Sequence, residues 1–90
     1  MPAADPAALQ PLQGLLRQLR EIKGVREARP GTFQVRGQAF AQFHTENAAV
    51  YAELKKPGGS GFDRFSMATP PEQRRFIDEA RLRAKRLDDD

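Results

Sequence analysis

Between Thr32 and Leu54 the chain alternates apolar and polar residues in short segments, a pattern typical of half-buried β-strands. Strands are predicted over Thr32–Arg36, over Ala39–His44 after a tight turn at Gly37, and over Ala48–Leu54. Turns this short join antiparallel neighbours, so the segment predicts a three-stranded meander. Val25–Arg29, which precedes a Pro-Gly turn, is a candidate fourth strand at the edge.

Two helical patterns flank these strands. The first is a stripe of apolar residues at helical spacing, and it predicts a helix that begins at Asp5-Pro6 or at Pro11 and stops before Gly24. The second begins at Thr69-Pro70-Pro71-Glu72, which has the form of a capping box. Its apolar face comprises Phe76, Ile77, Ala80, Ala84 and Leu87. The predicted class is α+β, with both helices on one face of an antiparallel sheet of three to four strands.

The chain of 90 residues predicts a single domain spanning residues 1–90. Residues 1–8 and 88–90 are expected to fray, as chain ends commonly do. Residues 55–61 carry three of the seven glycines and one proline and are predicted to form a flexible loop.

The absence of cysteine excludes disulfides and a cysteine nucleophile. The N-terminal residues do not resemble a signal peptide, and no apolar run is long enough to span a membrane, so we expect a cytoplasmic protein without a membrane partner. His44 is the only histidine, which argues against a metal site. A catalytic His44 would need an orienting carboxylate such as Glu46 or Glu53, and also a nucleophile. We therefore expect no enzyme, no catalytic residue and no cofactor.

The net charge of +3 is divided along the chain. Residues 1–30 carry five basic and three acidic side chains, and residues 55–90 carry nine and seven. Basic residues near predicted turns are candidate phosphate contacts: Arg36, Lys55, Lys56 and Arg64. The glycine-rich run Gly58–Gly61 follows two of them, and its backbone N–H groups are suited to an anion nest.

The alternation places Phe40, Gln42 and His44 on one face of their strand, together with Tyr51 of the next. Because both helices are expected on the other face, these four residues form the candidate binding surface. An open sheet face of this kind suits a protein partner or a second copy of the chain. It also suits single-stranded nucleic acid, which stacks on exposed aromatic rings.

The middle of the chain resembles a known family. The run Thr32–Phe43 (TFQVRGQAFAQF) resembles the hairpin of MmcQ/YjbR-like proteins, and Tyr51–Lys55 resembles the strand that follows it there. Phe43-His44 is similar to a related uncharacterised group, the luciferase-domain proteins. The resemblance implies a bacterial protein with an α-β-β-β-α arrangement and DNA binding through a double wing. It places a wing tip at Arg36–Gln38 and implies no catalytic residues. This chain departs from the family in having no tryptophan and in closing with Phe62–Phe65 and one long helix.

Three classes of function remain open at this stage. The first is a protein-interaction or self-associating domain that uses the open sheet face. The second is a nucleic-acid module that uses the four basic residues. The third is a small-ligand site around His44 and the Gly58–Gly61 loop.

Overall fold

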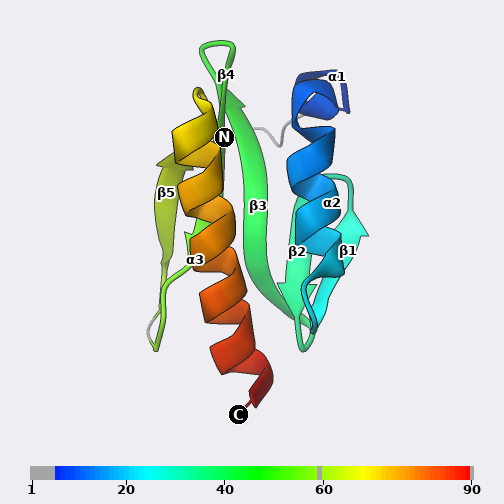
Figure 1. Cartoon of the computed structure of the whole chain (residues 1–90), viewed down its shortest axis with the longest axis vertical. Coiled ribbons are helices and arrows are strands. Elements are labelled where there is room, and N and C mark those ends of the chain that lie inside the picture. The colour runs from blue at the N-terminus through cyan, green and yellow to red at the C-terminus, as the bar shows by residue number, and fades with distance from the viewer. Residues whose placement is uncertain (1–5, 59, 90) are drawn as a thin grey trace.

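The computed structural model describes residues 6–58 and 60–89, and it shows two helical segments in front of a five-stranded antiparallel sheet (Figure 1). In chain order the elements are α1 (Pro6–Leu9), the 3-10 turn η1 (Gln10–Leu12), α2 (Gln13–Glu21), β1 (Val25–Arg29), β2 (Thr32–Val35), β3 (Gln38–Glu46), β4 (Ala49–Lys55), β5 (Phe62–Ser66) and α3 (Pro70–Asp89). The strand order β1-β2-β3-β4-β5 follows the chain, so the sheet is a meander. The predicted α+β class, with both helices on one sheet face, is confirmed.

The sheet has one strand more than predicted. Phe62–Ser66 pairs with β4 in a regular antiparallel register that brings Ala52 opposite Phe65. Five residues with two aromatics are too few for sequence periodicity to distinguish from an irregular return to the core. Strand β5 therefore forms one edge of the sheet and β1 the other.

The N-terminal helical segment is interrupted at Pro11. Helix α1 begins at Pro6, η1 contains Pro11, and α2 then continues to Glu21. A proline lacks the N–H that a helix interior needs, so the chain tightens into a 3-10 turn at this point. Four members of the predicted apolar stripe are buried and the fifth is half-buried against the core: Leu12, Leu15, Leu16, Leu19 and Ile22. Leu9 of α1, which was not predicted to belong to the stripe, is buried in the same core.

The start of α3 is the predicted capping box. The Thr69 N–H donates to Glu72 Oε1 at 3.1 Å, and the Glu72 N–H donates to Thr69 Oγ1 at 3.4 Å. The helix continues through Asp89. The helices therefore include residues 6–8 and 88–89, which we predicted to fray. Residues 1–5 and 90 lie outside the described residues, and so does the candidate helix cap Asp5.

Four phenylalanine rings join α3 to the sheet. The Phe43 ring lies 6.3 Å from Phe33 and 5.6 Å from Phe76, and the Phe76 ring lies 5.5 Å from Phe65, all edge to face. This arrangement is the favoured one for aromatic pairs. The row runs from β2 through β3 to α3 and β5, and Phe33, Phe43 and Phe76 are fully buried.

Phe40 lies in this core and not on the open face, so our prediction for Phe40 is wrong. The register of β2 and β3 shifts between Phe33 and Gln34, which pair with Ala41 and Ala39, and this leaves Phe40 as an extra residue in β3. Such a β-bulge turns two consecutive side chains to the same face. Phe40 and Ala41 are accordingly both buried, at 0% and 1% exposure.

Truncating Phe40 tests this placement. We expect Phe40→Ala to lower the free energy of unfolding by about 3–5 kcal/mol, because a buried ring leaves a cavity. Gln42→Ala, on the open face of the same strand, should change it by no more than about 0.5 kcal/mol. Urea unfolding followed by circular dichroism measures both. Equal tolerance of the two substitutions would contradict the bulge.

Candidate functional site

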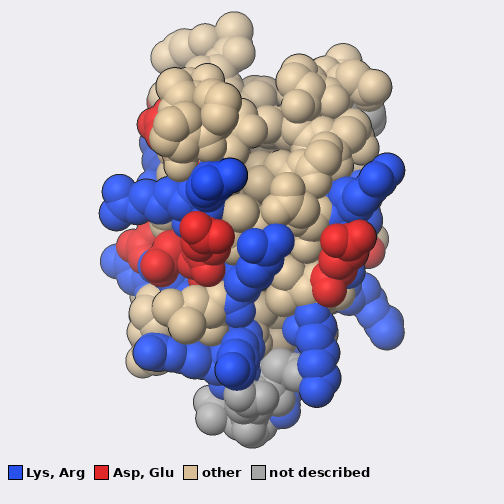
Figure 2. Space-filling view, viewed as in Figure 1, with Lys and Arg blue, Asp and Glu red and all other residues tan. Residues whose placement is uncertain are grey.

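Charged side chains divide the molecule into three zones along its long axis. The end formed by α1 and the start of α3 is mostly uncharged in the view of Figure 2, apart from a small acidic area at its left edge. The middle carries mixed charges, and lysine and arginine gather at the opposite end. That end contains the α2–β1 turn, the β2–β3 turn, the β4–β5 loop and the last turn of α3. We call it the basic end and define it by Lys23, Arg36, Lys55, Lys56, Lys85 and Arg86.

An open hollow of about 610 Å³ lies between the β4–β5 loop and the end of α3. The described residues that line it are Lys55, Lys56, Pro57, Gly58, Arg83, Arg86 and Leu87, of which four are basic and none is acidic. We call it the basic cleft. Lys55 and Lys56, which the sequence analysis proposed as phosphate contacts, therefore lie together, and Gly58 of the glycine-rich loop lines the same hollow.

Two of the cations in the cleft are held in place by neighbours. The Lys55 ammonium donates to Gln38 Oε1 at 3.0 Å, and this neutral amide leaves the charge of Lys55 uncompensated. Arg83 lies 3.0 Å from Asp63 and 3.1 Å from Glu79, and it donates to the Lys55 carbonyl at 3.1 Å. With a side chain only 12% exposed and two carboxylates beside it, Arg83 joins α3 to β4 and β5. It adds little net charge to the cleft.

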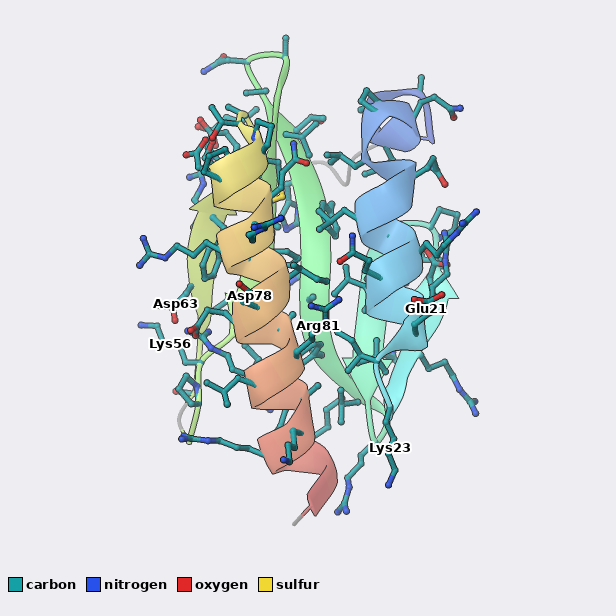
Figure 3. The ribbon with its side chains drawn as sticks, in the orientation of Figure 1. Glu21, Lys23, Lys56, Asp63, Asp78 and Arg81 are labelled. Atoms are coloured by element: carbon teal, nitrogen blue, oxygen red, sulfur yellow. The ribbon has the colours of Figure 1, made fainter. Side chains whose placement is uncertain are left out.

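The other cations of the basic end are exposed. Lys56 and Arg86 lie on the two sides of the cleft, and neither forms an ion pair with residues 7–58 or 60–87, the range whose side chains the structure describes. Lys23 projects past the end of the sheet (Figure 3). Arg36 and Lys55 line a smaller hollow of about 70 Å³ beside Leu87, so the β2–β3 turn adjoins the basic cleft.

Arg64 lies elsewhere, although the sequence placed it with the phosphate contacts. Its guanidinium donates to Glu46 at 2.8 Å and lies 4.0 Å above the centre of the Tyr51 ring. Both partners are on the open face of the sheet, and Arg64 does not line the basic cleft. The guanidinium also occupies a ring face of Tyr51 on which a base would stack, which disfavours the single-strand mode of binding.

The remaining candidates of the open face are half-buried among polar neighbours. Tyr51 lies directly opposite His44, and Gln42 lies opposite Glu53. His44 Nε2 lies 2.6 Å from Glu53 Oε1, but neither ring nitrogen has a hydrogen-bond partner of good geometry among the described residues. The surface is thus a closely packed polar layer, and no hydroxyl or amine nucleophile is hydrogen-bonded to His44.

The two α3 residues of the cleft are not among the binding residues predicted from the sequence. Arg83 and Arg86 are separated by three positions and therefore share a side of the helix. That spacing is visible in the sequence. Their position opposite Lys55 and Lys56 depends on how α3 packs on the sheet, which the spacing does not reveal.

No family model, curated protein or solved structure matches this chain. None of the helices in the described part is both long and apolar enough to cross a membrane. Within that part, no group of three or more His, Asp and Glu side chains is arranged to hold a metal ion.

The different roles of Arg83 and Arg86 can be separated by stability. Arg83→Gln should lower the free energy of unfolding by about 1–2 kcal/mol, since it removes contacts to two half-exposed carboxylates and a carbonyl. Arg86→Gln, one turn further along the same helix, should change it by less than about 0.5 kcal/mol. Chemical denaturation of both variants is the measurement. A larger loss for Arg86→Gln would show that we have assigned the two roles wrongly.

Proposed function

We propose that this domain binds the phosphate backbone of double-stranded nucleic acid through its basic end and has no catalytic activity of its own. One observation carries the proposal. Six cations from four segments far apart in the sequence converge on this end, and among them Lys55, Lys56 and Arg86 line a single cleft that contains no described acidic side chain. A basic patch of this kind is the electrostatic footprint of phosphate binding.

The dimensions of the basic end suit a duplex. The molecule measures 37 × 25 × 24 Å, and the basic end lies at one end of its long axis. A face about 25 Å across spans about 15 phosphate charges of a duplex, since these occur about every 1.7 Å along the axis. Three chain segments, the β2–β3 turn, the β4–β5 loop and the end of α3, meet at this face and can each contact a phosphate.

Two further observations support a duplex over a single strand. Four of the six phenylalanines are buried in the core, and the ring of Tyr51 is covered by Arg64. Without exposed rings, the stacking that holds single strands is missing. The resemblance of the β2–β3 hairpin to YjbR-like proteins implies a DNA ligand as well, and its turn, which carries Arg36, belongs to the basic end.

Self-association through the open sheet face, which the sequence also suggested, stays a prediction. The geometry favours it less, because the side chains of that face are polar and contact one another. Glu46, Tyr51 and Arg64 form one connected group, and His44 and Glu53 form another. A small-ligand site at His44 is less favoured for the same reason.

The proposal predicts binding that depends steeply on salt. We expect fluorescence anisotropy of a labelled duplex to give micromolar affinity at about 50 mM salt, and a loss of about 500-fold at about 200 mM if five phosphates are neutralised. Lys56→Gln combined with Arg86→Gln should reduce the slope of log K against log salt by about 2. A single strand of equal length should bind more weakly under each condition.

A matched control removes the same charge elsewhere. Arg17→Gln combined with Arg74→Gln changes two exposed arginines outside the basic end and should leave the slope within about 0.5 of the original. If both double variants lose affinity equally, binding is not localised to the basic end. Absence of binding at low salt, where the phosphate attraction is strongest, would overturn the proposal.

Removing negative charge from the chain should strengthen duplex binding, whereas the basic-end variants above remove positive charge and should weaken it. Asp88, Asp89 and Asp90 follow Leu87 in the sequence, so removing them makes the chain more positive by three charges and strengthens its attraction to phosphate. A chain that ends at Leu87 should therefore bind the duplex about 3- to 10-fold more tightly at low salt, with the difference fading as salt increases. The same anisotropy titration measures this. Weaker binding by the shortened chain would contradict an electrostatic contact here.

A further inference from the structure

The two edges of the sheet differ in how they are protected from pairing. Edge strand β1 has a register irregularity between Glu27 and Arg29 and three charged residues among five. Bulges and charges are the usual means by which an edge strand avoids another strand. Edge strand β5 pairs with β4 without any irregularity.

The charged side chains of β5 do not prevent another strand from pairing with its free edge. Arg64 is drawn over its own sheet by Glu46 at 2.8 Å and by the Tyr51 ring at 4.0 Å. Asp63 is drawn toward α3, where it lies 3.0 Å from Arg83. Both charged side chains of the strand are thus committed to intramolecular contacts, and the backbone of β5 is left open at its outer side.

The hydrogen-bond pattern identifies which backbone groups are open. Met67 N–H donates to the Val50 carbonyl, and Lys56 N–H donates to the Gly61 carbonyl, so residues 61 and 67 bond toward β4. Since this bonding alternates in an antiparallel pair, residues 63 and 65 also bond toward β4. Phe62, Arg64 and Ser66 therefore direct their N–H and C=O groups outward.

A groove of about 590 Å³ runs beside this edge, between β5 and α3. On its α3 side the groove is lined by the two glutamates Glu72 and Glu79 and by the two arginines Arg75 and Arg83. Equal numbers of opposite charges on this flank of α3 make a surface that can complement its own copy, as a two-fold interface requires.

We propose that the β5 edge joins a second copy of this chain in a two-fold antiparallel dimer. With Arg64 at the axis, Phe62 pairs with Ser66 of the other copy, which gives about six backbone hydrogen bonds and one continuous sheet. The two α3 helices then run antiparallel on the same face of that sheet. This direction turns the β5-side flanks of the two helices toward each other, so that the glutamates and Arg75 of one copy face those of the other.

One strand and one helix flank form an interface near the small end of the specific range, below about 1,200 Å² in total. We therefore expect a dissociation constant of about 10–500 μM. Sedimentation equilibrium should show the mass rising from the monomer value of 10.1 kDa toward twice that value as the concentration increases from about 10 μM to about 1 mM.

Variants at one position separate the backbone from the side chain. Arg64→Pro removes an N–H that faces outward and leaves the bonds to β4 intact, so it should abolish the dimer. Arg64→Ala keeps that N–H and should retain the dimer. On α3, Arg75→Glu should weaken association about 10-fold, while Arg74→Glu, which makes the same charge change at the adjacent position, should alter it by less than about 2-fold.

A second measurement keeps the test decisive if Arg64→Pro does not fold. Amide hydrogen exchange of the unmodified chain should slow at Phe62, Arg64 and Ser66 as its concentration increases, and should not change along β1. A monomeric mass up to about 1 mM, or slowing at β1 in place of β5, would overturn the proposal. If the chain stays monomeric at all concentrations, a second copy does not occupy the β5 edge, and the remaining candidate occupant is a strand of another protein.

Discussion

The contact between Phe43 and Phe76 organises the rest of the structure. Their rings meet edge to face at 5.6 Å, and each ring also contacts another phenylalanine, Phe33 or Phe65. Through these contacts the middle of the sheet determines where α3 lies and how it is rotated. The rotation that buries Phe76 also buries Ala80 and Ala84, and it turns Arg83 toward the β5 side. The position of every functional side chain on α3 therefore follows from one aromatic contact in the core.

Arg83 connects this packing to the basic cleft. It lies at the boundary between core and solvent, where two carboxylates and a carbonyl occupy its guanidinium. Because these contacts fix the end of α3 against β4 and β5, the exposed Arg86 lines the same hollow as Lys55 and Lys56. Arg83, whose charge is compensated by two carboxylates, thus holds the walls of the cleft in place, and its exposed neighbours supply the positive charge. Such a division between positioning and binding residues is common where a charged site must be held rigid.

Sequence reasoning predicted the fold class correctly because its signals were local. The capping box at Thr69 and the alternation in β4 depend on residues close together in the chain, and both are present in the structure. Phe40 was misplaced because a bulge adds one residue to β3, and the pairing partner that reveals the bulge is in another strand. Side chains of a strand alternate between its two faces, so a missed insertion assigns every residue on one side of it to the wrong face.

The residues of the candidate site likewise divide into those that a local sequence pattern predicts correctly and those whose position depends on tertiary contacts. Lys55 and Lys56 were found because they precede a glycine-rich loop, whereas Arg64, just after that loop, was grouped with them by proximity in sequence alone. In β5 its side chain points to the open sheet face, where Glu46 and Tyr51 are its partners. The contribution of Arg86 depends on the rotation of α3, which the distant Phe43 determines. Charge clusters formed by tertiary contacts of this kind have no local signature.

The two surfaces proposed here are independent because of the direction of β5. This strand runs from the loop at the basic end toward the end formed by α1 and the start of α3, so a copy paired antiparallel to it faces the opposite way. The basic ends of a two-fold dimer would then lie at its two extremes, with neither covered by the other copy. Association and phosphate binding therefore respond to different variants, and the loss of one leaves the other in place.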